Sequence, residues 1–207
     1  MKQFQIQFLS ISFFLLLVSC GSYPKKMNYV KEGITKEYAF NPYFSNPAID
    51  YVYKANIAFR ENNFGGILII KKIDEDSHRI LFTTEMGNKI FDFTISDNTY
   101  KTNYLNDQIN NQKFIKVLVN DFKVLINEDV KINSSYKLDS TSIFDSQLNG
   151  MDYYYCYKSN KLESITNVVG KKEKASYLFF DIDSDVAKNI RILHPNFNLN
   201  INLKLIK

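Results

Sequence analysis

The sequence has few of the residues that cross-link small domains. It contains two cysteines among 207 residues, Cys20 and Cys156, and it has no tryptophan. Two cysteines allow one disulfide at most, so a scaffold held by several disulfides is excluded. A chain of this length can instead bury about 70% of the surface that it exposes when unfolded, which is enough for a hydrophobic core.

Recognisable catalytic motifs are also missing. The sequence has no G-x-S-x-G, H-E-x-x-H, P-loop or G-x-G-x-x-G pattern. The run that starts at Asp181 imitates a calcium loop, but it has Val186 where glycine is required and Ile192 where a carboxylate is required. We therefore expect a protein that is not an enzyme and that has no metal and no other cofactor.

The two histidines and the charges fit this expectation. His78 follows the acidic residues 74–76, a set that could bind a metal, but a solvated polar turn explains the same residues. His194 precedes Pro195, which is more typical of a bulge or turn than of a catalytic base. The 26 basic and 22 acidic residues are scattered along the chain, which argues against a nucleic-acid partner.

One long apolar run is present, near the N-terminus. It covers about 11 residues up to Val18, within the roughly 7–15 that a secretory signal needs. A transmembrane helix needs roughly 20 apolar residues, so the run is too short to span a bilayer. It ends in Leu17-Val18-Ser19-Cys20, which resembles the lipobox of bacterial lipoproteins.

The resemblance implies that the chain is cut before Cys20 and that Cys20 carries acyl chains. Two or more such chains hold a protein firmly on a membrane, because each buried methylene contributes about 0.8 kcal/mol. The alternative is that Cys20 is an ordinary thiol beside a signal peptide. If Cys20 is acylated, Cys156 has no partner within the chain and is a small apolar residue on a strand.

We expect three segments: residues 1–19 as a signal peptide, 20–48 as the lipidated N-terminus and a tether, and 49–207 as one folded domain. The tether contains three of the four prolines and has no clean hydrophobic period. Four of its aromatic residues could dock on the domain, namely Tyr38, Phe40, Tyr43 and Phe44.

Alternation of apolar and polar residues dominates the domain and predicts half-buried β-strands. Tight turns are expected at residues 74–78, 86–88 and 170–171. The predicted strands cover residues 51–59, 65–73, 79–85, 89–95, 99–105, 151–158, 162–169, 175–182, 190–194 and 197–205.

One segment, residues 110–127, has a helical period instead. Its polar residues recur every three or four positions, and Phe114, Leu118, Phe122 and Leu125 lie opposite them. Asp107, Asn110 or Asn111 could cap this helix, and a strand over 122–126 is the alternative. Together the elements predict a mainly β (α+β) fold: a curved antiparallel half-barrel of about 9–11 strands, with the helix covering its concave side.

This arrangement resembles the LolA/LolB family of bacterial envelope proteins. The local resemblance runs over residues 51–105, from "YKANIAF" through "GGILIIKK" to "SHRILFTTEMGNKIFDFTI". It implies an apolar cavity for acyl chains, lined here by the four apolar helix residues, and a membrane-inserting turn at Met86-Gly87. The family usually has leucine at the position of Met86, and its strands often carry tryptophan, which this chain lacks. The lipobox at Cys20 corresponds to the LolB side of the family.

The resemblance implies a monomeric lipoprotein on the periplasmic face of the outer membrane. It would accept lipoprotein cargo from a LolA-like carrier and insert that cargo into the membrane. The alternative function is an accessory or structural lipoprotein that binds a protein or lipid without transfer. Two structural alternatives stay open: Met86 could fold onto the core, and the helix could pack without any cavity.

Overall fold

The computed structural model describes residues 21–96 and 99–206. Its helices are α2 (Tyr23–Lys26), the 3₁₀ helix η1 (Asp107–Ile109) and α3 (Gln112–Ile126). Its strands are β1 (Val30–Glu32), β2 (Tyr38–Phe40), β3 (Tyr51–Phe59), β4 (Asn62–Lys72), β5 (Ser77–Thr83), β6 (Lys89–Ser96), β7 (Thr99–Leu105), β8 (Asp129–Lys131), β9 (Ser134–Leu138), β10 (Thr141–Leu148), β11 (Met151–Lys158), β12 (Lys161–Val169), β13 (Lys172–Asp183), β14 (Val186–His194) and β15 (Leu199–Leu205).

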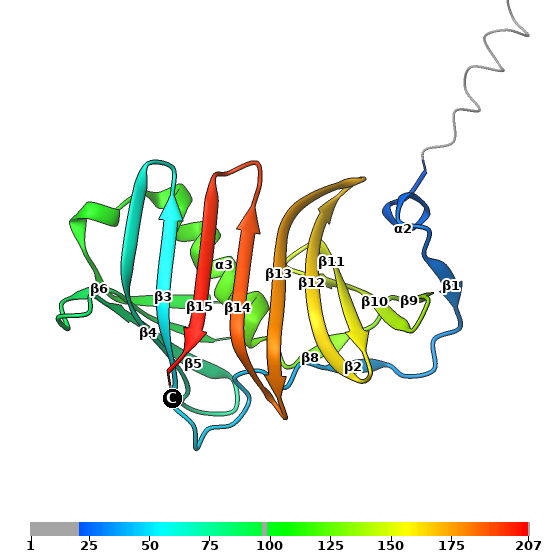
Figure 1. Cartoon of the computed structure of the whole chain (residues 1–207), viewed down its shortest axis with the longest axis horizontal. Helices are drawn as coiled ribbons and strands as arrows, with labels where there is room; N and C mark the ends of the chain where they lie inside the picture. Colours follow the sequence, from blue (N-terminus) through cyan, green and yellow to red (C-terminus); the bar gives the residue numbers. More distant parts are fainter. Residues whose placement is uncertain (1–20, 97–98, 207) are drawn as a thin grey trace, which may run out of the picture.

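Within the described residues, thirteen strands form one antiparallel sheet in the order β1-β9-β10-β11-β12-β13-β14-β15-β3-β4-β5-β6-β7. Figure 1 shows that this sheet curves strongly and that its two edge regions bend to the same side. The predicted curved antiparallel half-barrel is confirmed. The main sheet has more strands than expected, because β1, β9 and β10 come from stretches whose polar residues hide any hydrophobic period.

Strand alternation places one set of side chains on each face, since neighbouring residues point to opposite sides of a sheet. In β3, Tyr51, Tyr53, Ala55, Ile57 and Phe59 are buried, while Lys54 and Asn56 between them are exposed. The C-terminal strand β15 pairs with β3 along its whole length and has the same pattern. The buried side chains of the two strands therefore share the concave face.

Register shifts within four strand pairs help the sheet to bend, because a bulge increases the local twist. Gly66 marks a close approach of β4 and β5. A Cβ atom at this position would collide with the carbonyl oxygen of Thr83 and would crowd the ring of Phe82. Glycine is the residue that permits this contact.

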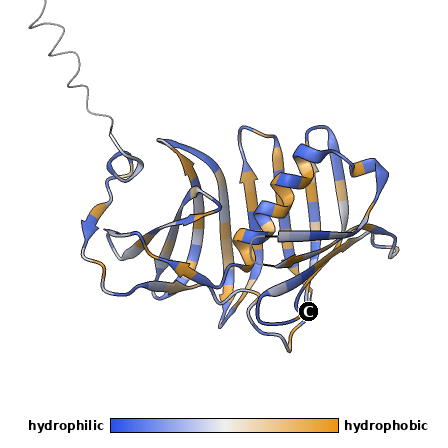
Figure 2. Ribbon diagram, turned by 180° about the vertical axis from the view of Figure 1, so that it is seen from behind, coloured by the Kyte–Doolittle hydropathy of each residue, from blue (hydrophilic) through white to orange (hydrophobic). Residues whose placement is uncertain are grey.

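The helix α3 packs on the concave side of the sheet, as predicted (Figures 1 and 2). The side chain of Asn111 caps it by accepting hydrogen bonds from the backbone N–H groups of Lys113 and Phe114, each at 3.1 Å. The helix continues to Ile126, so the alternative of a strand over residues 122–126 is wrong. Helix propensity and the apolar stripe prevail there over the local β-favouring residues.

The segment from Gly21 to residue 48, which the sequence predicts to be a tether, contributes α2, β1 and β2. Strand β1 pairs with β9, and β2 forms a separate two-stranded sheet with β8 on the concave side. Two of the four aromatic residues, Tyr43 and Phe44, are buried in the core, whereas Tyr38 and Phe40 are about half exposed. The predicted Cys20 anchor and signal peptide lie outside the described residues.

Candidate functional site

The concave face of the sheet carries the larger of the two hydrophobic clusters that the described residues form. Strands β3, β4, β6, β13, β14 and β15 all point buried residues to this side. Aromatic side chains are prominent, and the fully buried ones include Tyr51, Tyr53, Tyr153, Tyr155, Tyr177, Phe82, Phe91 and Phe93. Because aromatic rings bury 150–250 Å² each, this face contributes much of the core.

The four helix residues predicted to line a cavity all face this surface. Phe114, Leu118, Phe122 and Leu125 are each 2% exposed or less. The ring of Phe114 stacks on Phe59 with centroids 4.5 Å apart, and the ring of Phe122 lies 5.9 Å from Phe91. The four side chains therefore pack against the sheet in this conformation, and the pockets of the molecule described below are lined by other residues.

A buried polar cluster fixes the middle of α3 to the sheet, and sequence reasoning missed it. Asp121 is fully buried, and its carboxylate accepts a hydrogen bond of 2.7 Å from the hydroxyl of Tyr177. The Nε2 atom of His194 lies 2.9 Å from both of its oxygens. Burial raises the pKa of Asp121, although the contacts with His194 and Tyr177 act in the opposite direction.

The carbonyl oxygen of His194 accepts a hydrogen bond of 3.1 Å from the N–H of Phe197, so this residue begins a turn, as the sequence predicted. It is the last residue of β14, and its ring reaches α3 across the concave side. The available signal was Asp121 itself, a charged residue within the apolar stripe of the helix. Only the fold supplies its partner, 73 positions further along the chain.

Two tyrosines of strand β11, Tyr153 and Tyr155, place their hydroxyls near α3. The side chain of Asn120 donates a hydrogen bond of 3.0 Å to the hydroxyl of Tyr153. The Tyr155 hydroxyl is buried as well, beside the side chain of Asn127 at the end of α3.

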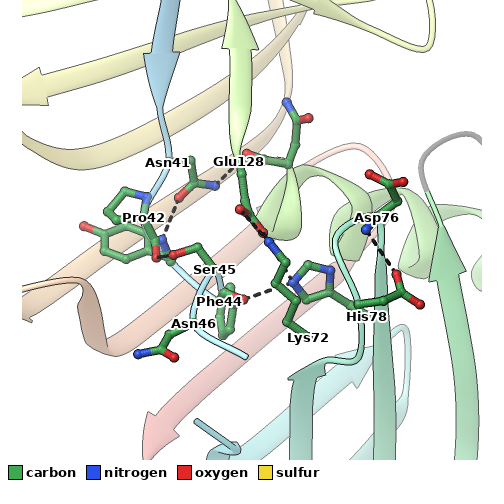
Figure 3. A network of polar contacts seen from close by, with 12 residues as sticks. Asn41, Pro42, Phe44, Ser45, Asn46, Lys72, Asp76, His78 and Glu128 are labelled. Atoms are coloured by element: carbon green, nitrogen blue, oxygen red, sulfur yellow. Dashed lines mark hydrogen bonds and ion pairs between the residues drawn. The ribbon is translucent and has the colours of Figure 1, made fainter. Parts of the chain in front are cut away.

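The C-terminal end of α3 is held by the segment that precedes β3, as Figure 3 shows. The side-chain amide of Asn41 donates to the carbonyl oxygens of Leu125 and Asn127, at 3.0 and 3.2 Å. These carbonyls belong to the helix end, where no intrahelical donor is available. Asn41 therefore ties the N-terminal segment to the helix that covers the concave face.

Next to this contact lies His78, for which the sequence predicted a solvated turn. The side chain is instead 4% exposed, and its Nε2 atom donates to the carbonyl oxygen of Phe44 at 3.0 Å. Lys72 and Glu128 form an ion pair beside it, with Lys72 Nζ 2.6 Å from the nearer carboxylate oxygen. The prediction was wrong because strand β5 begins at Ser77, so the turn ends at Asp76 and His78 already belongs to the strand.

Several pockets lie outside the helix–sheet contact. One, of about 270 Å³, adjoins His78 and is lined mainly by Glu75, Asp76, Lys123, Glu128 and Asp129. A shallower groove of about 700 Å³ lies on the convex face, where Lys54, Asn56, Arg191 and Asn202 surround Phe180. In the part of the chain that the structure describes, no three or more His, Cys, Asp and Glu residues are placed to hold a metal ion.

Met86 stands at the tip of the hairpin that joins β5 and β6. Its side chain is 93% exposed, so it does not fold onto the core. Gly87 follows with a positive φ of 86°, and its N–H donates to the carbonyl oxygen of Thr84 to close the turn. Among residues 21–96 and 99–206, no helix is long and apolar enough to cross a membrane.

No protein-family model matches the chain, and no curated protein matches it either. Among solved structures, a LolA superfamily protein from Nitrosomonas europaea is similar, with a TM-score of 0.51 and 6% identity over 81% of this chain and 88% of that one. A domain of a putative outer membrane lipoprotein-sorting protein from Vibrio parahaemolyticus (TM-score 0.44, 6% identity, 76% and 83% covered) is more distant. So is a DUF1329 family protein from Desulfovibrio piger (TM-score 0.42, 5% identity, 75% and 83% covered). The curved open sheet with a helix on its concave side is a LolA-like fold.

Proposed function

We propose that this protein is a LolB-like lipoprotein of the outer membrane, which accepts other lipoproteins by binding their acyl chains on the concave face of its sheet. The observation that carries the proposal is the apolar concave face, which is covered by a single helix whose own apolar side is fully buried against it. Cargo would arrive from a LolA-like carrier in the periplasm. The protein would act as a monomer without a cofactor.

Binding requires α3 to move away from the sheet, because the four apolar helix residues fill the space beneath it. An acyl chain that takes their place exchanges one apolar contact for another. The hydrophobic free energy, about 25 cal/mol per Å² of buried apolar area, is then largely conserved. The energy of opening rests mainly on the polar contacts of Asp121, Asn120 and Asn41 with the rest of the domain.

Transfer needs no catalysis in this scheme. Cargo passes from the carrier to this protein and then to the bilayer along a gradient of affinity between apolar sites. The exposed side chain of Met86 is the candidate that enters the membrane during delivery. Acylation of Cys20 would keep the protein at the outer membrane, and Cys20→Ala should abolish incorporation of labelled fatty acid. Undiminished incorporation would contradict the anchor.

The acyl-binding face is tested by photo-crosslinking with the full chain. Benzoylphenylalanine is placed either at Phe114, under the helix on the concave side, or at Phe180, which is 43% exposed on the convex face. Both changes replace one aromatic side chain by a larger one. After mixing with an acylated lipoprotein bound to its carrier, we expect crosslinks to the acyl chains from position 114 and none from position 180.

The second candidate function is an accessory lipoprotein that binds a partner without transfer. The groove around Phe180 favours it, since the guanidinium carbon of Arg191 lies 5.8 Å from the centre of the Phe180 ring and polar side chains line the rest. Crosslinks to protein from position 180, with none to acyl chains from position 114, would support this function against the first.

A further inference from the structure

The first helix of the described chain, α2, packs on the convex face of the sheet. Tyr23 of α2 is 3% exposed and packs against Ile143, Tyr154 and Val168 of strands β10, β11 and β12. Its ring centroid lies 4.8 Å from that of Tyr154. An aromatic residue buried this deeply shows that α2 is seated on the sheet in this conformation.

Polar contacts fix α2 to the hairpin that joins β12 and β13. The hydroxyl of Tyr23 donates to a carboxylate oxygen of Glu173 at 3.0 Å. The ammonium group of Lys26 donates to the carbonyl oxygen of Lys171 at 3.2 Å. Gly21 also lies here, since a Cβ atom built on it would be 3.3 Å from Nζ of Lys171. The described part of the chain therefore begins beside this hairpin.

The surface formed by α2 and the β12–β13 hairpin is rich in lysine and has one exposed apolar residue at its edge. Lys25, Lys26, Lys171 and Lys172 are exposed, and Val169 at the end of β12 is 55% exposed. Gly170 and Lys171 form the two-residue turn that follows Val169, as the sequence predicted.

Two carboxylates lie nearby and cancel only part of this charge. Glu173 accepts the hydrogen bond from Tyr23, and Asp152, which pairs with Val168 across the sheet, accepts one from the side chain of Gln147 at 2.8 Å. Both keep their negative charge, but the four lysines outnumber them. Clustered lysines around an exposed apolar residue suit the interface of a bilayer that contains acidic lipids.

We propose that this surface, formed by α2 and the β12–β13 hairpin, is the face that lies on an acidic membrane. The lysines contact the lipid phosphates, and Val169 enters the interface beside the acyl anchor. The inference rests on the anchor at Cys20 that is part of the proposed function, but it does not depend on the transfer of cargo. It adds a resting orientation of the domain on the bilayer.

This orientation holds Met86 away from the membrane. Five sheet positions separate β13 from β5, which is about 24 Å at roughly 4.8 Å per strand. In Figure 1, α2 and the hairpin that joins β5 and β6 lie at opposite ends of the longest axis. Delivery through Met86 would therefore require α2 to leave the sheet, so that the segment before β3 becomes a true tether.

The absence of tryptophan allows a direct test. Val169→Trp and Met86→Trp each place a single tryptophan at an exposed hairpin tip, so neither change should disturb the core. The membrane-bound full chain is purified in detergent and reconstituted, without cargo, in vesicles of phosphatidylethanolamine and phosphatidylglycerol that contain brominated lipid. We expect at least twofold quenching of the fluorescence of the Val169→Trp variant and little quenching of that of the Met86→Trp variant.

Quenching of the Met86→Trp variant alone, of both variants or of neither would overturn the inference. The charge is tested by Lys171→Gln with Lys172→Gln in the Val169→Trp background, which should lower the quenching in acidic vesicles. The matched control, Lys113→Gln with Lys116→Gln on the exposed side of α3, should not change it. Equal effects of the two pairs would contradict a specific membrane face. Because no cargo is present, these results are independent of whether the protein transfers lipoproteins.

Discussion

The Nε2 atom of His194 lies 2.9 Å from both carboxylate oxygens of Asp121, and this contact joins strand β14 to the helix that covers the concave face. Asp121 is the charged residue of α3 that the fold buries completely. Its environment makes the stability of the closed domain dependent on pH.

Asp121→Asn should alter this pH dependence in a defined direction. Burial raises the pKa of Asp121 above its ordinary value of 3.8, so the folded state binds its proton more tightly than the unfolded state does. The stabilisation is complete below pH 3.8 and is lost as the pH rises through the higher folded-state pKa. In urea unfolding, the stability of the natural protein minus that of Asp121→Asn should therefore fall as the pH rises above about 4. A rise over this range would show that the contact with His194 outweighs burial.

The contribution of His78 to stability should depend on pH in the opposite sense, and it should be lost as the pH falls. Burial lowers its pKa below 6.5, and its neutral ring donates to the carbonyl oxygen of Phe44. The folded state then resists protonation, so the stabilisation is complete above pH 6.5 and is lost as the pH falls through the lower folded-state pKa. Between pH 7 and 5, the natural protein should lose more stability than His78→Gln, whose amide can keep the hydrogen bond. Equal losses would show that His78 does not contribute.

The sequence predicts the elements of this fold that show a hydrophobic pattern within one segment, and it does not predict those that depend on contacts between distant segments. Period-2 alternation is local, and it identified β3 and β15 because each strand has one face in the core and one in solvent. The short strands β1 and β8 carry no such pattern, since three residues cannot display a period. They form strands because β1 pairs with β9 and β8 pairs with β2.

The features of the candidate site also fall into these two groups, those within one element and those between distant segments. The apolar face of α3 and the exposed tip at Met86 are each features of one element, so local patterns can indicate them. Their roles as a cavity lining and as an insertion device stay predictions. The pair formed by Asp121 and His194 depends on two segments that meet only in the folded chain. The burial of His78 depends on Phe44, which lies in a segment without any period. Contacts of this kind cannot be predicted from periodicity.

Two adjacent glycines provide a matched test of the close approach of β4 and β5. Gly66→Ala should lower the free energy of unfolding by about 1–3 kcal/mol, because the new methyl group would meet the backbone of Thr83. Gly65→Ala has no atom within 4 Å of the new methyl group and should be neutral or stabilising by up to about 1 kcal/mol. Thermal unfolding of the two variants distinguishes them. Similar effects would contradict the contact between the strands.

Leu118→Ala tests whether the helix is a packed part of the core. The side chain is fully buried, so its truncation should cost about 2–5 kcal/mol in denaturant unfolding. Lys116→Ala on the exposed side of the same helix should stay within about 0.5 kcal/mol of the natural protein. A loss below about 1 kcal/mol for Leu118→Ala would indicate instead that the residue faces an open cavity.

The last prediction concerns the tip at Met86. Because this side chain is 93% exposed, Met86→Glu should change the free energy of unfolding by no more than about 0.5 kcal/mol. Burial of a methionine side chain in acyl chains contributes about 1.5–3 kcal/mol, and a carboxylate forfeits this gain. Met86→Glu should therefore keep acyl binding but slow delivery of a labelled lipoprotein to outer-membrane fragments by roughly 10-fold or more, whereas Met86→Leu should deliver normally. Normal delivery by Met86→Glu would exclude the tip as an insertion device and would leave the concave face as the remaining support for a role in transfer.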